Sequence, residues 1–389
     1  MSAAAPALQR RGNLVAAIAT VAACDIAMGL SFTLMPLILE SRGVSASLIG
    51  LNAAMSPLGI LIAGPFLPRI VGHVGSKRVV WIVIVTIIAS LLAFNLTDSL
   101  AMWFVLRFIF GIAVGTLFTV SEAWVLTFAD AENRGRIMAI YTSILSITFA
   151  VGPLIIPFTG IEGWLPWLIG IACLAVSVLP LLFVKADEAV FQKDEGGGFF
   201  SFVMRAPLLL FAVASVTICD QVILSFFQIW GLRNGLTLEA ASWLLGIGIL
   251  GNALLQYPVG VLADRWSKMG VVILAAAVTM ILALSLALVV GSWLIWPVML
   301  ILGTAYFAIY TVALAIMGDN FHGPDLVAGS AAFSVMWGIG GIVGPALTGA
   351  AVDRFGIGAF PISVAVPYAI LLAGLAITGG VLIREQSRV

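Results

Sequence analysis

The stretch Arg107-Phe-Ile-Phe-Gly111-Ile-Ala-Val-Gly115-Thr-Leu-Phe-Thr-Val-Ser-Glu122 holds two full charges inside a long apolar run. A charged side chain at the centre of a bilayer costs about 2.5 kcal/mol or more, so such residues face a partner or a water-filled cavity. Helical steps of three and four place both charges and both glycines on one face. We therefore expect this face to point into a helix bundle and not at lipid.

The whole composition agrees with a membrane protein. Hydrophobic residues make up 62% of the 389 residues and charged residues 9%, far from the average of soluble proteins. About 20 consecutive apolar residues cross a bilayer as a helix. A zero net charge gives no indication of nucleic-acid binding. No zinc spacing, phosphate-binding loop or catalytic constellation is visible, so we expect no cofactor, no metal and no enzyme activity.

The apolar runs predict an all-α polytopic membrane protein with twelve spans. They fall near residues 13–40, 47–71, 79–97, 100–129, 137–159, 164–184, 207–232, 238–263, 270–291, 293–317, 326–351 and 357–383. An even number of spans places both termini on one side. Basic loop residues decide which side, because only Arg42, Arg233 and Arg354 lie in the opposite set of loops. We expect both termini in the cytoplasm and the chain in the inner (plasma) membrane of a bacterium.

The two halves of the chain repeat each other. Cys24-Asp25 in span 1 recurs as Cys219-Asp220 in span 7, and Gly152-Pro153 in span 5 recurs as Gly344-Pro345 in span 11. We expect an N-terminal six-helix bundle over residues 1–184, a cytoplasmic linker over 185–206 and a C-terminal bundle over 207–389. Phenylalanines near the end of this linker, from Phe199 to Phe202, suggest a segment resting on the membrane surface. Duplicated halves are typical of secondary transporters.

Two loops carry a family resemblance. Gly260-Val-Leu-Ala-Asp264-Arg265-Trp-Ser-Lys268 resembles the signature loop of the major facilitator superfamily, and Arg107-Phe-Ile-Phe-Gly111 is similar to that superfamily's span-4 motif. The first-half loop departs from the signature, since Pro68 stands where its carboxylate belongs. The resemblance implies two pseudo-symmetric six-helix bundles around a cavity lined mainly by spans 1, 4, 7 and 10. It also implies a gating role for Gly260, Asp264 and Arg265.

The charges within the spans are candidates for coupling transport to protons. A rise of 1.5 Å per residue puts Asp25 roughly 18 Å, Arg107 roughly 20 Å and Asp220 roughly 21 Å above the inner face, with Glu122 at roughly 10 Å. We expect Asp25 to pair with Arg107 when neither substrate nor proton intervenes. A static clamp between spans 1 and 4 is the structural alternative. Glu122, which has no expected cation at its depth, is the candidate for direct proton loading.

Polar and aromatic residues at similar depth are candidates for lining the cavity. They are Trp124, Gln221, Ser225, Gln228, Thr304, Tyr306 and Tyr310. Hydrogen bonding between helices is an equally good explanation for each of them. Three carboxylates against one guanidinium favour a cationic or neutral solute over an anion.

These patterns predict a monomeric, proton-coupled secondary transporter that moves a small organic solute by alternating access, with export slightly favoured. A proton-coupled uptake symporter for a sugar or other metabolite is the alternative that the same residues would serve. A membrane receptor or scaffold without transport is an alternative of another class. A receptor or scaffold would have no need for charged residues within the spans, because it would couple no transport to protons.

Overall fold

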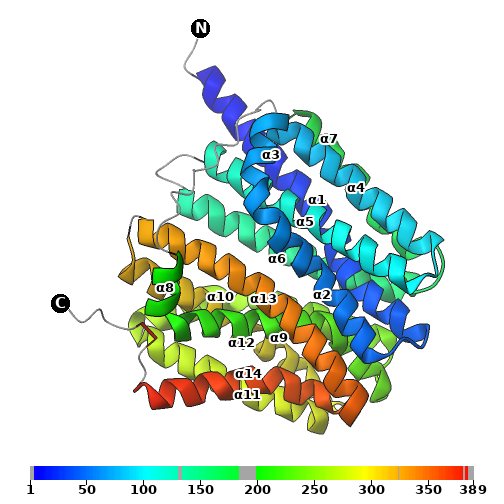
Figure 1. Ribbon diagram of the computed structural model, residues 1–389, viewed down its shortest axis with the longest axis vertical. Helices are drawn as coiled ribbons and strands as arrows, with labels where there is room; N and C mark the ends of the chain where they lie inside the picture. Colours follow the sequence, from blue (N-terminus) through cyan, green and yellow to red (C-terminus); the bar gives the residue numbers. More distant parts are fainter. Residues whose placement is uncertain (1–3, 130–133, 184–198, 323, 380–381, 384–389) are drawn as a thin grey trace. The chain divides into compact units, whose positions relative to one another are not determined.

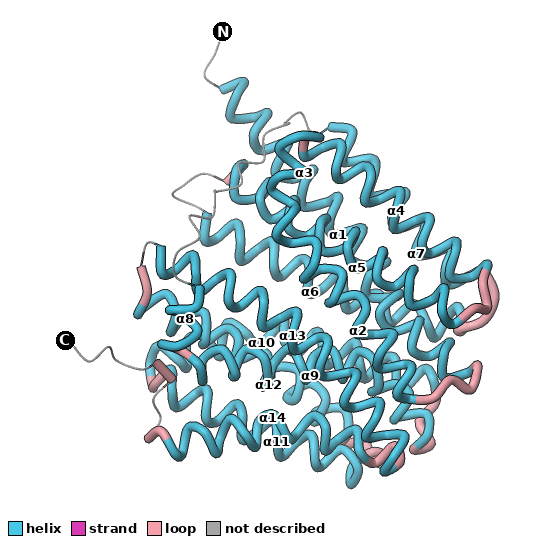
Figure 2. The backbone as a smooth tube through the Cα atoms, viewed as in Figure 1, coloured by secondary structure: helices cyan, strands magenta, loops and turns pink. Residues whose placement is uncertain are grey.

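The computed structural model describes residues 4–129, 134–183, 199–322, 324–379 and 382–383. These residues form helices and short loops with no strand (Figure 2). The helices labelled in Figure 1 are α1 Ala4–Ser41, α2 Ala46–Ala63, α3 Leu67–Val74, α4 Ser76–Leu96, α5 Leu100–Phe128, α6 Arg134–Thr159, α7 Leu165–Phe183, α8 Phe199–Arg205, α9 Pro207–Arg233, α10 Leu238–Arg265, α11 Lys268–Val289, α12 Ile295–Asn320, α13 Pro324–Phe355 and α14 Ala359–Ile377.

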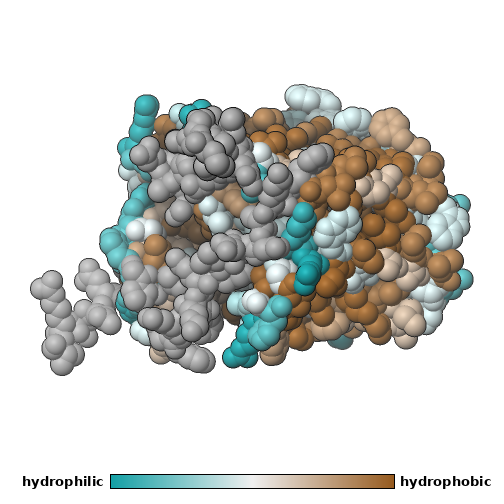
Figure 3. All heavy atoms as spheres, turned by 90° about the horizontal axis from the view of Figure 1, so that it is seen from above, coloured by the Kyte–Doolittle hydropathy of each residue, from teal (hydrophilic) through white to brown (hydrophobic). Residues whose placement is uncertain are grey.

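Twelve helical stretches are long and apolar enough to cross a membrane, as the sequence predicts. The second of these joins α2 and α3 through a 3-10 turn at Gly64–Phe66, where Pro65 removes a backbone donor. Large apolar side chains remain exposed along the helices, including Ile82, Leu288 and Ile377. Hydrophobic residues cover much of the surface that Figure 3 shows, as expected for a protein solvated by lipid.

The chain divides into two compact units. The first unit contains residues 1–38 and 55–192, and the second contains residues 39–54 and 193–389. Helices α9 to α14 all lie in the second unit. Residues 39–54, which end α1 and begin α2, come from the first half of the sequence but pack with the second unit. We call this segment the α1–α2 hairpin.

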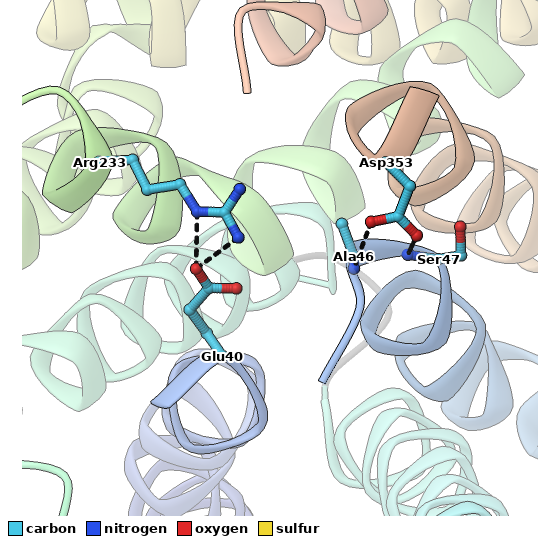
Figure 4. A network of polar contacts seen from close by, with 5 residues as sticks. All are labelled: Glu40, Ala46, Ser47, Arg233 and Asp353. Atoms are coloured by element: carbon cyan, nitrogen blue, oxygen red, sulfur yellow. Dashed lines mark hydrogen bonds and ion pairs between the residues drawn. The ribbon is translucent and has the colours of Figure 1, made fainter. Parts of the chain in front are cut away.

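Two polar contacts hold the α1–α2 hairpin on the second unit (Figure 4). Arg233 at the end of α9 forms an ion pair of 2.7 Å with Glu40. The carboxylate of Asp353 on α13 accepts hydrogen bonds from the backbone N–H groups of Ala46 at 2.9 Å and Ser47 at 2.8 Å. Asp353 thereby satisfies two of the free N–H groups at the start of α2.

Gly349 explains how α2 comes this close to α13. A Cβ atom at Gly349 would lie 2.2 Å from the backbone oxygen of Ala46, so a larger residue would force the two helices apart. One turn later on α13, Asp353 reaches the N–H groups of α2. The glycine and the carboxylate together fix the position of the hairpin.

The linker between the halves is described only from Phe199 onward, and its predicted residues 185–198 lie outside the described residues. Phe202 of α8 is fully buried and packs on Phe321 with ring centroids 4.7 Å apart. The suggestion that these phenylalanines rest on the membrane surface is therefore wrong for Phe202. Arg205 anchors the same helix through an ion pair of 2.7 Å with Asp325.

The Arg205–Asp325 pair changes the titration of both groups. The hydrogen bond from Arg205 lowers the pKa of Asp325, and the same bond raises the pKa of Arg205. A lowered carboxyl pKa means that this contribution to stability is present above the ordinary pKa of aspartate and is lost as the pH falls through the lowered value. The docking of α8 therefore persists at neutral pH.

Glycine seams set the close packing of the helices. A Cβ at Gly303 of α12 would lie 1.9 Å from the backbone oxygen of Gly248 on α10, whereas a Cβ at Gly318 of the same helix meets nothing within 4 Å. In the first unit, Gly111 lies against the backbone of Ser56 in the same way, at 2.3 Å. Small residues at such contacts allow membrane helices to approach closely.

We expect Gly303→Val to destabilise the second unit by at least about 1–3 kcal/mol, because the new side chain would overlap backbone that has no room to move. The measurement is the melting temperature of the purified protein in detergent. Gly318→Val is the matched control on the same helix and is expected to melt close to wild type. Equal melting temperatures for the two variants would contradict the packing described above.

Candidate functional site

Asp25 is a buried carboxylate within the first unit. Only 1% of its surface is exposed, and α1 carries it well inside its span. Oδ2 accepts a hydrogen bond of 3.2 Å from Thr148 on α6, and Oδ1 has no hydrogen-bond partner. Asp25 forms no ion pair with any residue in the described part of the chain. An isolated buried charge of this kind is costly unless it is neutralised.

Thr148 offers Asp25 incomplete compensation. Its hydroxyl oxygen lies 2.9 Å from the carbonyl oxygen of Ile144 and 3.1 Å from that of Leu145, in addition to its contact with Asp25. One hydroxyl carries one hydrogen, so it can donate fully to only one of these acceptors at a time. The closest acceptor is a backbone carbonyl and not the carboxylate.

Arg107 is buried to the same degree as Asp25 but has different partners. Its Nη1 atom donates to the sulfur of Met35 at 2.7 Å, and its guanidinium carbon lies 5.3 Å from the centre of the Phe32 ring. Its Nε atom has no hydrogen-bond partner. A sulfur atom and an aromatic ring are weak partners for a buried cation.

The expected Asp25–Arg107 pair is not formed in the structure. Met35 follows Asp25 by ten residues on α1, so Arg107 lies about 15 Å further along that helix. The depth estimate failed because it counted Asp25 from one end of its span and Arg107 from the opposite end. Arg107 lies seven residues after the start of α5 at Leu100, and Met35 lies six residues before the end of α1 at Ser41. Arg107 and Met35 are therefore at the same level.

Tyr141 lies near enough to both Asp25 and Glu122 to interact with them electrostatically. This tyrosine on α6 is buried, makes a hydrogen bond of 2.8 Å with Ser121, and interacts electrostatically with both Glu122 and Asp25. Glu122 itself is exposed on α5. The first unit therefore gathers two carboxylates around a tyrosine and a threonine, which we call the acidic cluster: Asp25, Glu122, Tyr141 and Thr148.

The sequence analysis missed Tyr141 and Thr148. The two residues are seven positions apart on α6, which is two helical turns, and they share one face of an apolar span. Polar side chains on a common face of span 5 are a signal that the sequence contains. Neither residue is charged, so the charges within the spans do not reveal this polar face.

Asp220 is the corresponding carboxylate of the second unit, and it is half-buried at the middle of α9. Its carboxylate accepts hydrogen bonds from the hydroxyl of Tyr306 at 3.0 Å and from Nε2 of Gln221 at 3.1 Å. The structure thus brings together three of the residues selected from the sequence. Both of these donors are neutral.

Other expected lining residues make contacts within their own units. Trp124 is fully buried and donates to Ser76 at 3.0 Å, and Gln228 donates to Ser242 at 2.8 Å. Thr304 donates to the carbonyl of Leu300 on its own helix, and Ser225 is buried. These side chains are engaged in packing in this structure. Tyr310 is half-buried and stacks edge-on against Trp337 at 5.6 Å.

The signature loop lies at the end of α10. Asp264 and Arg265 are exposed, and the ion pairs between described residues include neither of them. Gly260 has open space around its Cα atom. Lys268, at the start of α11, pairs with Asp319 at the end of α12. Within the described ranges, no group of three or more His, Cys, Asp or Glu residues is arranged to hold a metal ion.

A duplicated set of membrane helices with carboxylates inside the spans defines a polytopic membrane transporter. The sequence profile of the Major Facilitator Superfamily matches residues 16–345 and 209–386. The chain belongs to the Major Facilitator Superfamily, whose members are transporters and not enzymes.

Individual relatives agree with this assignment. The chain is similar to an uncharacterized MFS-type transporter, YfkF of Bacillus subtilis, at 26% identity over 345 residues, covering 85% of this chain and 86% of YfkF. It is also similar to YcaD of Escherichia coli, another uncharacterized MFS-type transporter, at 23% identity over 335 residues, covering 85% of this chain and 86% of YcaD.

Solved structures share the fold. A bacterial homolog of the human lysosomal transporter Spinster, in an inward-facing and unoccupied conformation, has a TM-score of 0.72 at 14% identity and covers 96% of this chain and 94% of its own. The nucleoside transporter NupG has a TM-score of 0.73 at 14% identity and covers 96% of this chain and 98% of its own. At this identity the likeness establishes the fold alone.

Proposed function

We propose that this chain is a monomeric, proton-coupled secondary transporter of the bacterial inner membrane, with both termini in the cytoplasm. It moves a small organic solute by alternating access, and export is slightly favoured over uptake. The observation that carries the proposal is Asp25: a carboxylate 1% exposed within a membrane span, with one oxygen unpartnered and no ion pair to any described residue.

The chemistry of Asp25 supports proton coupling. A buried carboxylate without a cation is stabilised when it takes up a proton, because the charge disappears. Thr148 can accept a hydrogen bond from the protonated acid while donating its own hydrogen to Ile144, 2.9 Å away. When Asp25 is protonated, both its Oδ2–H group and the Thr148 hydroxyl make full hydrogen bonds. When Asp25 is ionised, Oδ2 must share the single hydroxyl hydrogen of Thr148 with a backbone carbonyl.

Glu122 and Tyr141 supply a route to Asp25. Glu122 is exposed, whereas Asp25 is enclosed. In our proposal Glu122 faces the aqueous cavity, where its carboxylate exchanges protons with water. Tyr141 interacts with both carboxylates and carries a hydroxyl that can donate and accept. In this mechanism, Glu122 loads the proton and Asp25 holds it while the carrier changes the side to which it opens.

The alternative is a proton-coupled symporter that takes up a sugar or other metabolite. The acidic cluster would serve export and uptake equally well. The two are distinguished by whether protons move with the solute or against it. A receptor or scaffold without transport is less well supported, because it has no use for unpaired carboxylates within the spans.

The test is a solute screen with purified protein in proteoliposomes that contain a pH-sensitive dye. Drug-like cations, sugars and organic anions are added outside, and protein-free liposomes serve as the control. We expect one class of solute to change the lumenal pH: acidification indicates symport and alkalinisation indicates antiport. A solute that is transported without moving protons, at a rate independent of the pH gradient, would overturn the proposal.

A further inference from the structure

Four aromatic side chains form a cluster between α12 and α13. The rings of Tyr310 and Trp337 have centroids 5.6 Å apart, those of Phe307 and Trp337 6.2 Å, and those of Tyr310 and Phe333 6.2 Å. We call Phe307, Tyr310, Phe333 and Trp337 the aromatic cluster. All four belong to the second unit.

The aromatic cluster is connected to Asp220 through neighbouring residues. Tyr306, whose hydroxyl donates to Asp220, directly precedes Phe307 on α12. On the other side, Thr217 lies one turn before Asp220 on α9 and donates to the carbonyl of Met336, the neighbour of Trp337, at 3.2 Å. The hydroxyl oxygen of Thr217 also lies 3.0 Å from the carbonyl oxygen of Ala214, so its single hydrogen is shared between the two carbonyls. Tyr306 and Thr217 therefore place neighbours of the aromatic cluster near the turn of α9 that holds Asp220.

Gly340 brings the two helices into direct contact at this level. A Cβ atom there would lie 1.8 Å from the hydroxyl oxygen of Thr217 and 2.9 Å from the carbonyl oxygen of Ala214. Gly344, one turn later on α13, faces Ile218 and Val222, which flank Asp220 on α9. Trp337 precedes Gly344 by seven residues, so the rings begin about 10 Å before Asp220 along the helix pair, a distance that a solute with several rings can span.

Asp220 has no cationic partner in this unit. It lies thirteen residues from each end of α9, about 20 Å from either end. The described Lys and Arg residues of the second unit all lie at or near helix ends: Arg42, Arg205, Arg233, Arg265, Lys268 and Arg354. The carboxylate is therefore met only by the neutral donors Tyr306 and Gln221.

Several of these groups are partly exposed, so a ligand can contact them. Asp220, Phe307, Tyr310 and Trp337 are half-buried, whereas Tyr306 and Phe333 are buried behind them. A negative charge next to accessible aromatic faces recognises an organic cation, because ring faces attract cations and the carboxylate neutralises them. An organic anion would meet repulsion, and a hydrated metal ion would find too few oxygen ligands.

We propose that Asp220 and the aromatic cluster form a binding site for an organic cation that carries aromatic rings. The proposal rests on the transport of a small organic solute proposed above and adds its chemical class. Asp220 neutralises the positive charge, and the faces of Trp337 and Tyr310 hold the rings of the solute. Tyr306 and Gln221 are neutral donors that leave the charge of the carboxylate available to the solute.

The test is equilibrium binding of radiolabelled tetraphenylphosphonium to the purified full-length protein in lipid nanodiscs, without a pH gradient. Tetraphenylborate, which has the same shape and the opposite charge, is the competitor control. We expect saturable binding of the cation that tetraphenylborate does not displace. Asp220→Asn and Trp337→Ala are each expected to weaken binding roughly tenfold, and Trp337→Phe is expected to keep most of it.

Control variants distinguish loss of the binding site from a general effect of substitution on the protein. Glu239→Gln and Trp293→Ala remove a carboxylate and an indole ring at exposed positions of this unit and are expected to bind as wild type does. If Asp220→Asn elutes as aggregate in size exclusion, Tyr306→Phe replaces it. This variant keeps the carboxylate and removes its neutral donor, so we expect tetraphenylphosphonium to bind at least as tightly as to wild type, and weaker binding would count against the proposal.

Three results would overturn the site: no saturable binding, equal displacement by tetraphenylborate, or wild-type binding by both Asp220→Asn and Trp337→Ala. Because the assay has no proton gradient, its outcome is independent of coupling. Proton-coupled flux of another solute with no cation binding would refute this site alone. Cation binding with no proton movement during transport would refute the proposed coupling alone.

Discussion

Joining Ser47→Cys to Asp353→Cys with a short bis-methanethiosulfonate reagent, which forms a disulfide with each cysteine, is expected to stop transport completely. A reducing agent cleaves these disulfides and is expected to restore transport. The two positions are neighbours, because the backbone N–H of Ser47 donates to the carboxylate of Asp353 at 2.8 Å (Figure 4). The α1–α2 hairpin comes from the first half of the sequence and packs with the second unit. Alternating access moves one repeat against the other, so a covalent link here prevents the cycle.

The two polar contacts of the hairpin are individually weak. Arg233 and Glu40 have side chains 42% and 20% exposed, and an exposed ion pair contributes about 0–1 kcal/mol. The cap that Asp353 provides at the start of α2 contributes about 0.5–2 kcal/mol. These values are small against a covalent bond, which explains why cross-linking is expected to have a far larger effect than removal of either contact.

The measurement is solute flux in proteoliposomes before linking, after linking and after reduction, in a background where Cys24, Cys173 and Cys219 are replaced by serine. Each single cysteine variant, treated with the same reagent, is the control and is expected to remain active. A linked double variant that transports at the rate of the singles would show that the hairpin does not leave α13 during transport.

The general architecture was accessible from the sequence because the bilayer imposes strong rules on it. Lipid requires long apolar helices, so the twelve spans appear as apolar runs. The Gly260 to Arg265 loop resembles a family signature, and the family profile confirms that assignment. Asp220 and Tyr306 were selected as polar residues of spans 7 and 10, and they form a hydrogen bond of 3.0 Å.

Pairings that depend on helix register were harder to predict. The sequence gives the order of residues along each span but not the offset between spans, and a difference of ten residues is about 15 Å. Arg107 consequently lies beside Met35 and Phe32 and not beside Asp25. Phe202 packs inside the second unit for a similar reason, since the gap left by Gly329 is visible only in three dimensions.

Asp25→Asn and Glu122→Gln are each expected to abolish transport driven by a pH gradient, with flux falling to that of protein-free liposomes. Neither amide can bind the transported proton, and no other carboxylate belongs to the acidic cluster. Both replacements keep the size of the side chain. Asparagine removes a buried charge and can still accept a hydrogen bond from Thr148, so we expect both variants to express and to melt as wild type does.

Counterflow separates a coupling defect from a general loss of function. Exchange of labelled for unlabelled solute at equal pH needs no net proton movement, so we expect it to continue in Asp25→Asn while pH-driven accumulation disappears. Glu239→Gln, at the exposed start of α10, is the control for removing a carboxylate outside the cluster. If both cluster variants accumulate solute against a gradient as wild type does, the proton is carried elsewhere, and the unpartnered oxygen of Asp25 has a structural origin.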